Sequence, residues 1–234
     1  MTPTADHAAA VLFDIDGTLV DSNYLHVHAW TRAFHEAGVE ADAWCIHRLI
    51  GMDGSRLVAS LAPNIDDETR QRLKDLHSRY YRELCPLLRV LSGGREILDR
   101  VASMRLQVVL ATSAPEDELS ILRAVLDRDG VVAAVTSAAD VDSAKPDPGI
   151  VKVALQRAGV PAARAVLVGD SVWDARAGVR AGVPIVGLLS GGISREELTG
   201  AGAAVVFEDP RDLMEHLSET PIASLSSSVL GVAD

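Results

Sequence analysis

Four aspartates of this 234-residue chain form two closely spaced pairs, each at the end of an apolar run. Asp14 and Asp16 are separated by one residue, so both side chains can project to the same side as the chain leaves a strand. Asp170 and Asp174 have the i, i+4 spacing that shares one face of an early helical turn. Carboxylates grouped away from water repel one another unless one is protonated or a cation lies among them. An all-oxygen, carboxylate-rich set of this kind is suited to Mg²⁺.

A lysine and two hydroxyl residues elsewhere in the chain could act on an anion held near these carboxylates. Lys145 supplies a positive charge, while the Thr112 hydroxyl and the backbone N–H of Ser113 supply neutral hydrogen-bond donors. The Asp14 carboxylate can act as a nucleophile and form an aspartyl-phosphate. Asp16 is then placed to protonate the leaving oxygen and later to activate water. The set predicts Mg²⁺-dependent phosphoryl transfer, with Asp14, Asp16, Thr112 and Lys145 as catalytic residues and Ser113 as a substrate-binding residue.

The elements that must position these groups are short apolar runs, rich in Val, Leu and Ala, that do not alternate with polar residues. Such runs are typical of parallel strands that are covered on both faces. Helix-length amphipathic stretches separate them, which predicts an α/β fold with a doubly wound, Rossmann-like parallel sheet. Ligands bind beyond the carboxyl ends of the strands in such sheets, and the polar residues fall there. The predicted strands are residues 9–13, 106–111, 131–135, 165–168, 184–188 and 203–207.

Capping residues predict where some of the intervening helices begin and end. Asp147 can cap a helix whose first residue is Pro148 and which ends at Gly159. Ser194 and Glu197 have the spacing of a capping box, in which each residue satisfies a backbone N–H of the other.

The alternation of strands and helices is interrupted after the first strand. Residues 22–91 contain no convincing strand and instead show helical stripes of apolar residues, one of which ends at Gly38. An insertion of this length is too long for a crossover connection. We therefore predict a small, all-helical cap domain over residues 22–91 and a discontinuous catalytic core over residues 1–21 and 92–217. Residues 218–234 are rich in serine, and we predict a flexible tail there.

Four segments of the chain carry a resemblance to a known family. They are Asp14-Ile15-Asp16-Gly17-Thr18-Leu19, Thr112, Lys145-Pro146, and Gly169-Asp170-Ser171 followed by Asp174. In this order they resemble the four motifs of the haloacid dehalogenase-like superfamily, and the helical insertion resembles its type 1 cap. The resemblance implies that Asp14 is the nucleophile and Asp16 the general acid/base. It also implies that Mg²⁺ is held by the Asp14 side chain, the Asp16 backbone oxygen and Asp170, with Asp174 adjacent to these ligands.

Two branches of that superfamily resemble different parts of the chain. His26 occupies the position of the cap histidine of β-phosphoglucomutases, which makes it a candidate substrate-binding residue. Those mutases carry a phosphate-binding arginine where this chain has Gly54, and Arg56 is out of register. The form of the fourth motif is more similar to that of phosphoglycolate-phosphatase-type hydrolases. Dehalogenases of the superfamily lack the second aspartate of the first motif, so Asp16 favours phosphate chemistry.

We therefore predict a phosphatase that hydrolyses a small phosphorylated metabolite, either a sugar phosphate or a phosphoglycolate-like compound. The first alternative is a phosphotransferase of the β-phosphoglucomutase kind, which would use the same Asp14 and Asp16. A remoter alternative is a non-catalytic relative that binds a partner.

Composition and charge narrow the choice of partners. A formal net charge of −11 argues against binding to nucleic acid or to anionic lipid. The chain lacks the pattern of a signal peptide and lacks an apolar stretch of the ~20 residues that span a membrane. Cys45 and Cys85 have neither metal-ligand nor redox spacing, so we expect two reduced thiols. These features predict a cytoplasmic protein without membrane contacts, and we expect a monomer or homodimer.

Overall fold

A parallel sheet forms the centre of the molecule. The computed structural model describes residues 9–141 and 145–230. The sheet has the strand order β5-β4-β1-β6-β7-β8, and each neighbouring pair is parallel. The chain builds outward from β1 in both directions, which confirms the predicted doubly wound α/β fold, and the strands match the predicted runs to within two residues. They are β1 Ala10–Phe13, β4 Gln107–Ala111, β5 Val132–Thr136, β6 Ala165–Gly169, β7 Ile185–Leu188 and β8 Val205–Phe207.

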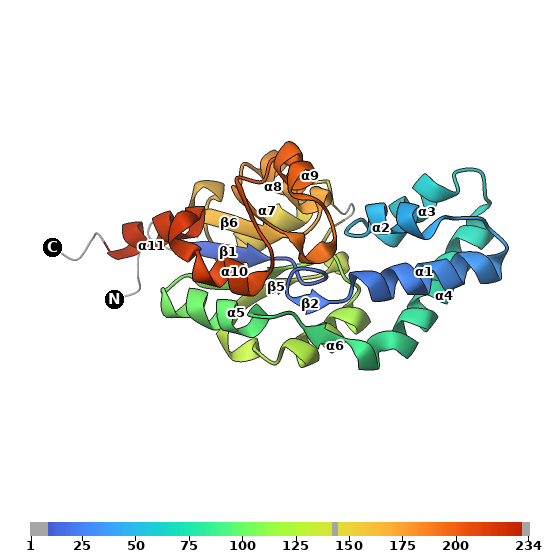
Figure 1. The fold of residues 1–234 in the computed structure, drawn as a ribbon, viewed down its shortest axis with the longest axis horizontal. Helices are drawn as coiled ribbons and strands as arrows, with labels where there is room; N and C mark the ends of the chain where they lie inside the picture. The colour runs from blue at the N-terminus through green and yellow to red at the C-terminus, as the bar shows by residue number, and fades with distance from the viewer. Residues whose placement is uncertain (1–8, 142–144, 231–234) are drawn as a thin grey trace.

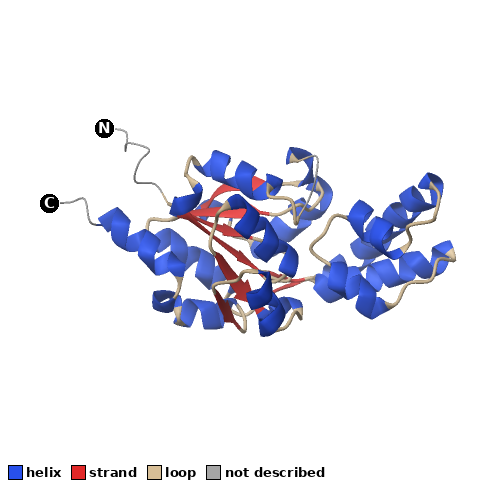
Figure 2. Ribbon diagram, turned by 90° about the horizontal axis from the view of Figure 1, so that it is seen from above, coloured by secondary structure: helices blue, strands red, loops and turns tan. Residues whose placement is uncertain are grey.

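Helices cover both faces of this sheet, as Figure 2 shows. They are α5 Gly94–Ser103, α6 Glu116–Leu126, α7 Gly149–Ala158, α8 Val172–Ala181, α9 Arg195–Ala201, α10 Pro210–Glu215 and α11 Pro221–Leu230. Val11 and Phe13 of β1 belong to one apolar cluster, with residues of α5, α6, α10 and α11. Ala10 and Leu12 belong to another, with residues of α7, α8 and α9. Burial on both faces is the reason that the strand sequences contain no polar alternation.

Four helices fill the insertion that follows β1 and lie beyond one end of the sheet, at the right of Figure 1. They are α1 Asn23–Ala37, α2 Ala43–Leu49, α3 Gly54–Leu61 and α4 Asp67–Leu84. The long helices α1 and α4 pack along each other, and Phe34 and Leu73 are buried between the inserted helices. The predicted stripe of α1 ends at Gly38, whose φ of 70° lies in the left-handed region that favours glycine.

A two-stranded antiparallel sheet joins the inserted helices to the rest of the chain. Strand β2 Val20–Asp21 pairs with β3 Arg89–Val90. The prediction of no strand within residues 22–91 is therefore wrong at β3. A strand of two residues buries no periodic set of side chains, so an apolar pattern cannot indicate it.

The capping predictions fit the observed helix ends, with one shift. Ser194 and Glu197 form the capping box of α9, and Gly159 ends α7. Helix α7 begins at Gly149, one residue later than predicted, because Pro148 is its N-cap residue. The Asp147 carboxylate accepts the Gly149 N–H at 3.0 Å. Short 3₁₀ helices lie at η2 Cys85–Leu87, η3 Asp129–Val131, η4 Ala138–Asp140, η5 Ala162–Arg164, η6 Leu189–Gly191 and η7 Leu217–Glu219.

The segment expected to be a flexible tail forms η7 and α11 instead, so that prediction is wrong for residues 218–230. Ile222 and Leu225 are 0% and 6% exposed and belong to the same apolar cluster as Phe13. Their i, i+3 spacing places both on one helix face, and the serine-rich sequence around them obscured this signal. Residues 231–234 of the expected tail lie outside the described residues.

Truncating one buried side chain of α11 measures its contribution to stability. We expect Ile222→Ala to lower the free energy of unfolding by about 2–4 kcal/mol, because it leaves a cavity at the edge of the core. Ser218→Ala, at an exposed position, is the control and should change stability by less than about 0.5 kcal/mol. Urea unfolding followed by circular dichroism gives both values. Equal values for the two variants would show that α11 does not contribute to the core.

Candidate active site

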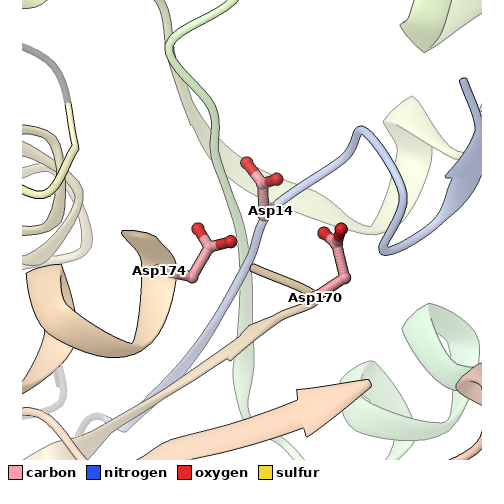
Figure 3. A group of neighbouring side chains, drawn as sticks. All are labelled: Asp14, Asp170 and Asp174. Carbon is pink, nitrogen blue, oxygen red and sulfur yellow. The ribbon is translucent and has the colours of Figure 1, made fainter. Parts of the chain in front are cut away.

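The carboxyl ends of β1 and β6 bring three aspartates together. Asp14 follows β1, Asp170 follows β6, and Asp174 lies in the first turn of α8. One carboxylate oxygen from each lies within 4.8 Å of the other two, and all three residues are buried. Figure 3 shows the three side chains as neighbours, with Asp14 between Asp174 and Asp170. The structure therefore gathers the side chains of three of the four residues predicted to form the metal site.

The Lys145 ammonium group lies against two of these carboxylates. Its Nζ is 2.6 Å from Asp14 Oδ1 and 2.7 Å from Asp174 Oδ1, and the residue is 1% exposed. Burial alone would lower the pKa of Lys145, but the charges of Asp14 and Asp174 outweigh it and raise the pKa above its usual value. Lys145 is therefore a permanent positive charge beside the predicted nucleophile.

Both carboxylate oxygens of Asp170 accept hydrogen bonds from residues near β1. Thr18 Oγ1 donates to Oδ1 at 2.7 Å, and Asn23 Nδ2 donates to Oδ2 at 2.8 Å. The backbone at Gly17 and Gly191 also approaches Asp170 closely. A Cβ atom at Gly17 would lie 2.4 Å from Asp170 Oδ2, and one at Gly191 would lie 1.8 Å from it. Glycine is needed at both positions, and the φ of 70° at Gly17 needs it as well. Asp170 is thus held in one orientation.

Asp174 is oriented by a capping box rather than by a helical face shared with Asp170. Ser171 is the N-cap residue of α8, so Asp170 lies outside the helix and the expected i, i+4 relation is wrong. Ser171 Oγ accepts the Asp174 N–H at 3.2 Å, and Asp174 Oδ2 accepts the N–H and the hydroxyl of Ser171. The box turns the Asp174 carboxylate back toward Asp14 and Lys145.

The three carboxylates are costly to ionise together. Burial raises the pKa of Asp14 well above its usual value, and only Lys145 opposes it appreciably. Burial, and then the charge of Asp174, raise the pKa of Asp170 to about 7. A divalent cation among the oxygens would favour the ionised forms. Buried, all-carboxylate donors suit a hard ion, so the residues fit the predicted Mg²⁺ site.

Asp16 lies apart from this cluster and contacts residues that lead into α1. Ser22 Oγ donates to Asp16 Oδ1 at 2.6 Å, and His26 Nε2 lies 3.5 Å from the same oxygen. Burial raises the pKa of Asp16, but the hydrogen bond and charge of His26, with smaller effects of Ser22 and Lys145, together outweigh burial, so the pKa falls below the usual value. Burial lowers the pKa of His26, but the hydrogen bond with Asp16 and the charges of Asp16 and Glu118 together outweigh burial, so the pKa rises above the usual value. The pair therefore holds a proton on His26.

A second histidine extends this contact into the inserted helices. His77 Nε2 of α4 lies 3.1 Å from His26 Nδ1. The His26 ring stacks on Tyr81, with ring centroids 3.9 Å apart, and His77 stacks on Trp30 at 4.1 Å. Burial and the charge of His26 lower the pKa of His77 well below its usual value, so His77 is neutral. The sequence did not indicate His77, because its role depends on α1 and α4 lying side by side.

A pocket of about 260 Å³ opens above these groups, between the sheet edge and the inserted helices. Its walls include all six of the predicted catalytic and substrate-binding residues: Asp14, Asp16, His26, Thr112, Ser113 and Lys145. Thr112 is 2% exposed, and its hydroxyl accepts the Ala114 N–H at 3.0 Å. Gly54 also lines the pocket, whereas Arg56 does not and lies 3.7 Å from Asp53 Oδ2.

Comparison with known proteins places this arrangement in a family. Residues 11–188 match the model of the haloacid dehalogenase-like hydrolases, and the chain belongs to that family. It is 31% identical over 213 residues to a phosphoglycolate phosphatase from Rhodospirillum rubrum, a match that covers 86% of this chain and 87% of that protein. It is 29% identical over 213 residues to a phosphorylated carbohydrates phosphatase from Thermotoga maritima, covering 90% and 98%. The structure matches a hydrolase from Pseudomonas syringae with a TM-score of 0.86 and 37% identity, covering 90% and 98%.

These similarities confirm the predicted family and the predicted enzyme class, a phosphoric monoester hydrolase. Within residues 9–141 and 145–230, no helix combines the length and the apolar character needed to cross a bilayer. The roles of individual site residues, the cytoplasmic location and the oligomeric state stay predictions.

The raised pKa of Asp170 leads to a pH dependence of stability that a metal should remove. Without divalent cations the Asp170 carboxyl group is more protonated in the folded protein than in the unfolded chain between about pH 4 and about pH 7, so its contribution to stability falls as pH rises through this range. We expect Asp170→Asn to reduce this fall, which amounts to at most about 4 kcal/mol for one group. Saturating Mg²⁺ should reduce it in the wild type, because the ion favours the ionised carboxylate.

Urea unfolding at pH 5, 6, 7 and 8, in EDTA and in Mg²⁺, measures these slopes. Asp75→Asn, at an exposed position on α4, is the matched control and should retain the wild-type slope. Identical slopes for wild type and Asp170→Asn in EDTA would contradict the assignment.

Proposed function

We propose that the protein is a Mg²⁺-dependent phosphatase that hydrolyses a small phosphorylated metabolite through an aspartyl-phosphate on Asp14. The observation that carries the proposal is the shared pocket: Asp14, Asp16 and Lys145 line it together, and Asp14 also belongs to the carboxylate cluster. A phosphoryl group in this pocket can therefore meet a nucleophile, an acid/base group and positive charge at once.

In the first step an Asp14 carboxylate oxygen attacks phosphorus, and the bond from phosphorus to the ester oxygen breaks. The leaving oxygen takes a proton through Asp16, and His26 is the source of that proton, because the pKa values of the pair place it there. Lys145 holds the attacking carboxylate by its 2.6 Å contact. The product alcohol then leaves.

In the second step a water molecule attacks the phosphorus of the aspartyl-phosphate and the bond to Asp14 breaks. Asp16 takes a proton from that water, and inorganic phosphate is released. Thr112 and the Ser113 backbone N–H flank the phosphoryl oxygens as hydrogen-bonding groups. When bound, Mg²⁺ held by Asp14, the Asp16 backbone oxygen and Asp170 offsets the negative charge of the phosphoryl group.

The inserted helices act as a cap that closes the pocket, excludes bulk water and selects the substrate. A pocket of about 260 Å³ suits a compact metabolite, such as a sugar phosphate or a phosphoglycolate-like compound. The activities in the names of the Rhodospirillum rubrum and Thermotoga maritima relatives support this range.

The pocket gives less support to the alternative of a phosphoglucomutase-like phosphotransferase. That activity needs a second phosphate to be held by the cap, and the cap position expected to carry an arginine is Gly54, which lines the pocket without a side chain. A wild type that isomerised β-glucose 1-phosphate, given a bisphosphate activator, without releasing phosphate would favour the mutase. The family and the phosphatase relatives also argue against the non-catalytic alternative.

Replacing the nucleophile tests the proposal directly. Asp14→Asn keeps the shape of the side chain, but an amide cannot form the acyl-phosphate bond. We expect phosphate release from sugar phosphates and from 2-phosphoglycolate to fall by about a thousandfold or more. Asp75→Asn should stay within about twofold of wild type, since it lies on the exposed face of α4. Comparable phosphate release by Asp14→Asn and wild type would contradict the proposed mechanism.

The role of Asp16 predicts a dependence on the leaving group. An alkyl ester needs a proton on its leaving oxygen, whereas p-nitrophenolate leaves without one. Asp16→Asn should therefore lose about 10²–10⁴-fold in kcat for an alkyl phosphate and clearly less for p-nitrophenyl phosphate. Single-turnover rates for the two esters measure the difference. Equal losses for both esters would exclude Asp16 as the general acid.

A further inference from the structure

Glu118 is a buried carboxyl group of the pocket to which no role is yet assigned. It is the third residue of α6, it is 6% exposed, and it lines the pocket together with Asp14 and Asp16. No described residue donates a hydrogen bond to its side chain or forms an ion pair with it. Its oxygens are also absent from the unpaired polar atoms sealed from solvent. The carboxyl group is therefore open to the pocket and has no protein partner.

The neighbouring acidic residues show that burial of an unpaired carboxyl group is not a general property of this helix terminus. Glu116 and Asp117 lie in the same first turn but are exposed, and Asp117 forms an ion pair with Arg82 at 2.6 Å. The helix dipole favours acidic residues in this turn and accounts for such exposed positions. It does not account for a carboxyl group that is turned inward, because a buried polar group without a partner lowers stability.

The charged groups around Glu118 do not supply a hydrogen-bond donor to its carboxyl group. Burial raises its pKa, the charge of His26 opposes this, and Asp16 and Asp117 add to it. Arg82, the remaining basic group that acts on it, is already paired with Asp117. In either protonation state the carboxyl group offers an acceptor oxygen to a ligand in the pocket.

We infer that the Glu118 carboxyl group accepts a hydrogen bond from a hydroxyl group of the substrate, so that the preferred substrates are phosphate esters of sugars or polyols. The inference rests on the proposed phosphatase function. Glu118 lines the same pocket as Thr112, and the charges of Asp16 and His26 act on it, so it lies near the predicted acid/base group. The hydroxyl side chains of Ser55 and Ser78 line the same pocket and suit a polyhydroxylated ligand.

The same geometry disfavours a substrate whose other end is a carboxylate. Such a group would approach the acidic Glu118 and Asp16. Of the described basic residues that line the pocket, Lys145 is already in contact with Asp14 and Asp174, and His26 is paired with Asp16, which leaves Lys74 against the two carboxyl groups. Phosphoglycolate should therefore be a poorer substrate than a sugar or polyol phosphate.

The test compares kcat/KM for propyl phosphate, glycerol 1-phosphate, glucose 6-phosphate and 2-phosphoglycolate. We expect the kcat/KM of the wild type to be about tenfold or more higher for the better of the two hydroxylated esters than for propyl phosphate. A hydrogen bond to a charged group contributes a difference of this size. Glu118→Met keeps the length of the side chain without an acceptor oxygen and should abolish this preference, mainly through KM. Glu118→Gln keeps one acceptor oxygen and should retain most of it. Glu116→Gln, exposed in the same turn, is the control and should behave as wild type.

A Glu118→Met variant with the full wild-type preference would overturn the inference, and so would 2-phosphoglycolate as the best of the four substrates. Glu118→Ala replaces Glu118→Met if circular dichroism shows that the latter does not fold. A wild type that hydrolyses none of these esters, nor p-nitrophenyl phosphate, contradicts the proposed function instead. Calorimetric binding of glucose 6-phosphate and propyl phosphate, with Mg²⁺ present, then decides the inference: tighter binding of the hydroxylated ester must be lost in Glu118→Met.

Discussion

A buried lysine between two buried carboxylates is the interaction on which the active-site edge depends. Lys145, 1% exposed, contacts Asp14 and Asp174 at 2.6 Å and 2.7 Å. Charges removed from water are stable only when their partners are close and their remaining hydrogen-bonding positions are filled. The capping box of α8 and the Thr18 hydroxyl meet this requirement for Asp174 and Asp170. Two apolar clusters then hold the strands that carry these groups at a fixed spacing.

The inserted helices take part in the same network of charges. Asn23, the first residue of α1, donates to Asp170, and His26, one turn later, lies against Asp16. A ring nitrogen of His47 in α2 lies 2.9 Å from the carbonyl oxygen of Gly191, the glycine that packs on Asp170. The position of these helices therefore affects the hydrogen bonds of the metal-site and acid/base residues. In the proposed mechanism, substrate selection by these helices and chemistry at the sheet edge therefore depend on shared side chains.

The sequence alone was sufficient to predict the strands and the residues at their ends, because both signals are local. Apolar runs between amphipathic stretches identify buried parallel strands, and the fold rule for such sheets then assigns Asp14, Thr112 and Asp170 to one edge. Local signals failed where a contact depends on three-dimensional packing. Strand β3 exists only through its pairing with β2, and the packing of Ile222 depends on a core formed by distant residues.

Sequence analysis missed several residues of the candidate site for the same reason. Nothing near Asn23 in the chain indicates that its amide meets Asp170, which lies 147 positions away. His77 is an ordinary residue on an amphipathic helix until α1 places His26 beside it. Glu118 is one of three successive acidic residues, and only its burial separates it from the other two. Such residues are defined by their surroundings rather than by their type or spacing.

The surroundings of the three carboxyl groups of the pocket also differ, and each environment suits a different role. Burial raises the pKa values of Asp14 and Glu118, whereas the contact with His26 lowers that of Asp16. Asp14 is the one of the three that touches a lysine, which favours its ionised form and suits a nucleophile. Asp16 shares its proton with a histidine, which suits a group that must first give and later take a proton. Glu118 has neither partner, which leaves its carboxyl group open to a molecule that enters the pocket.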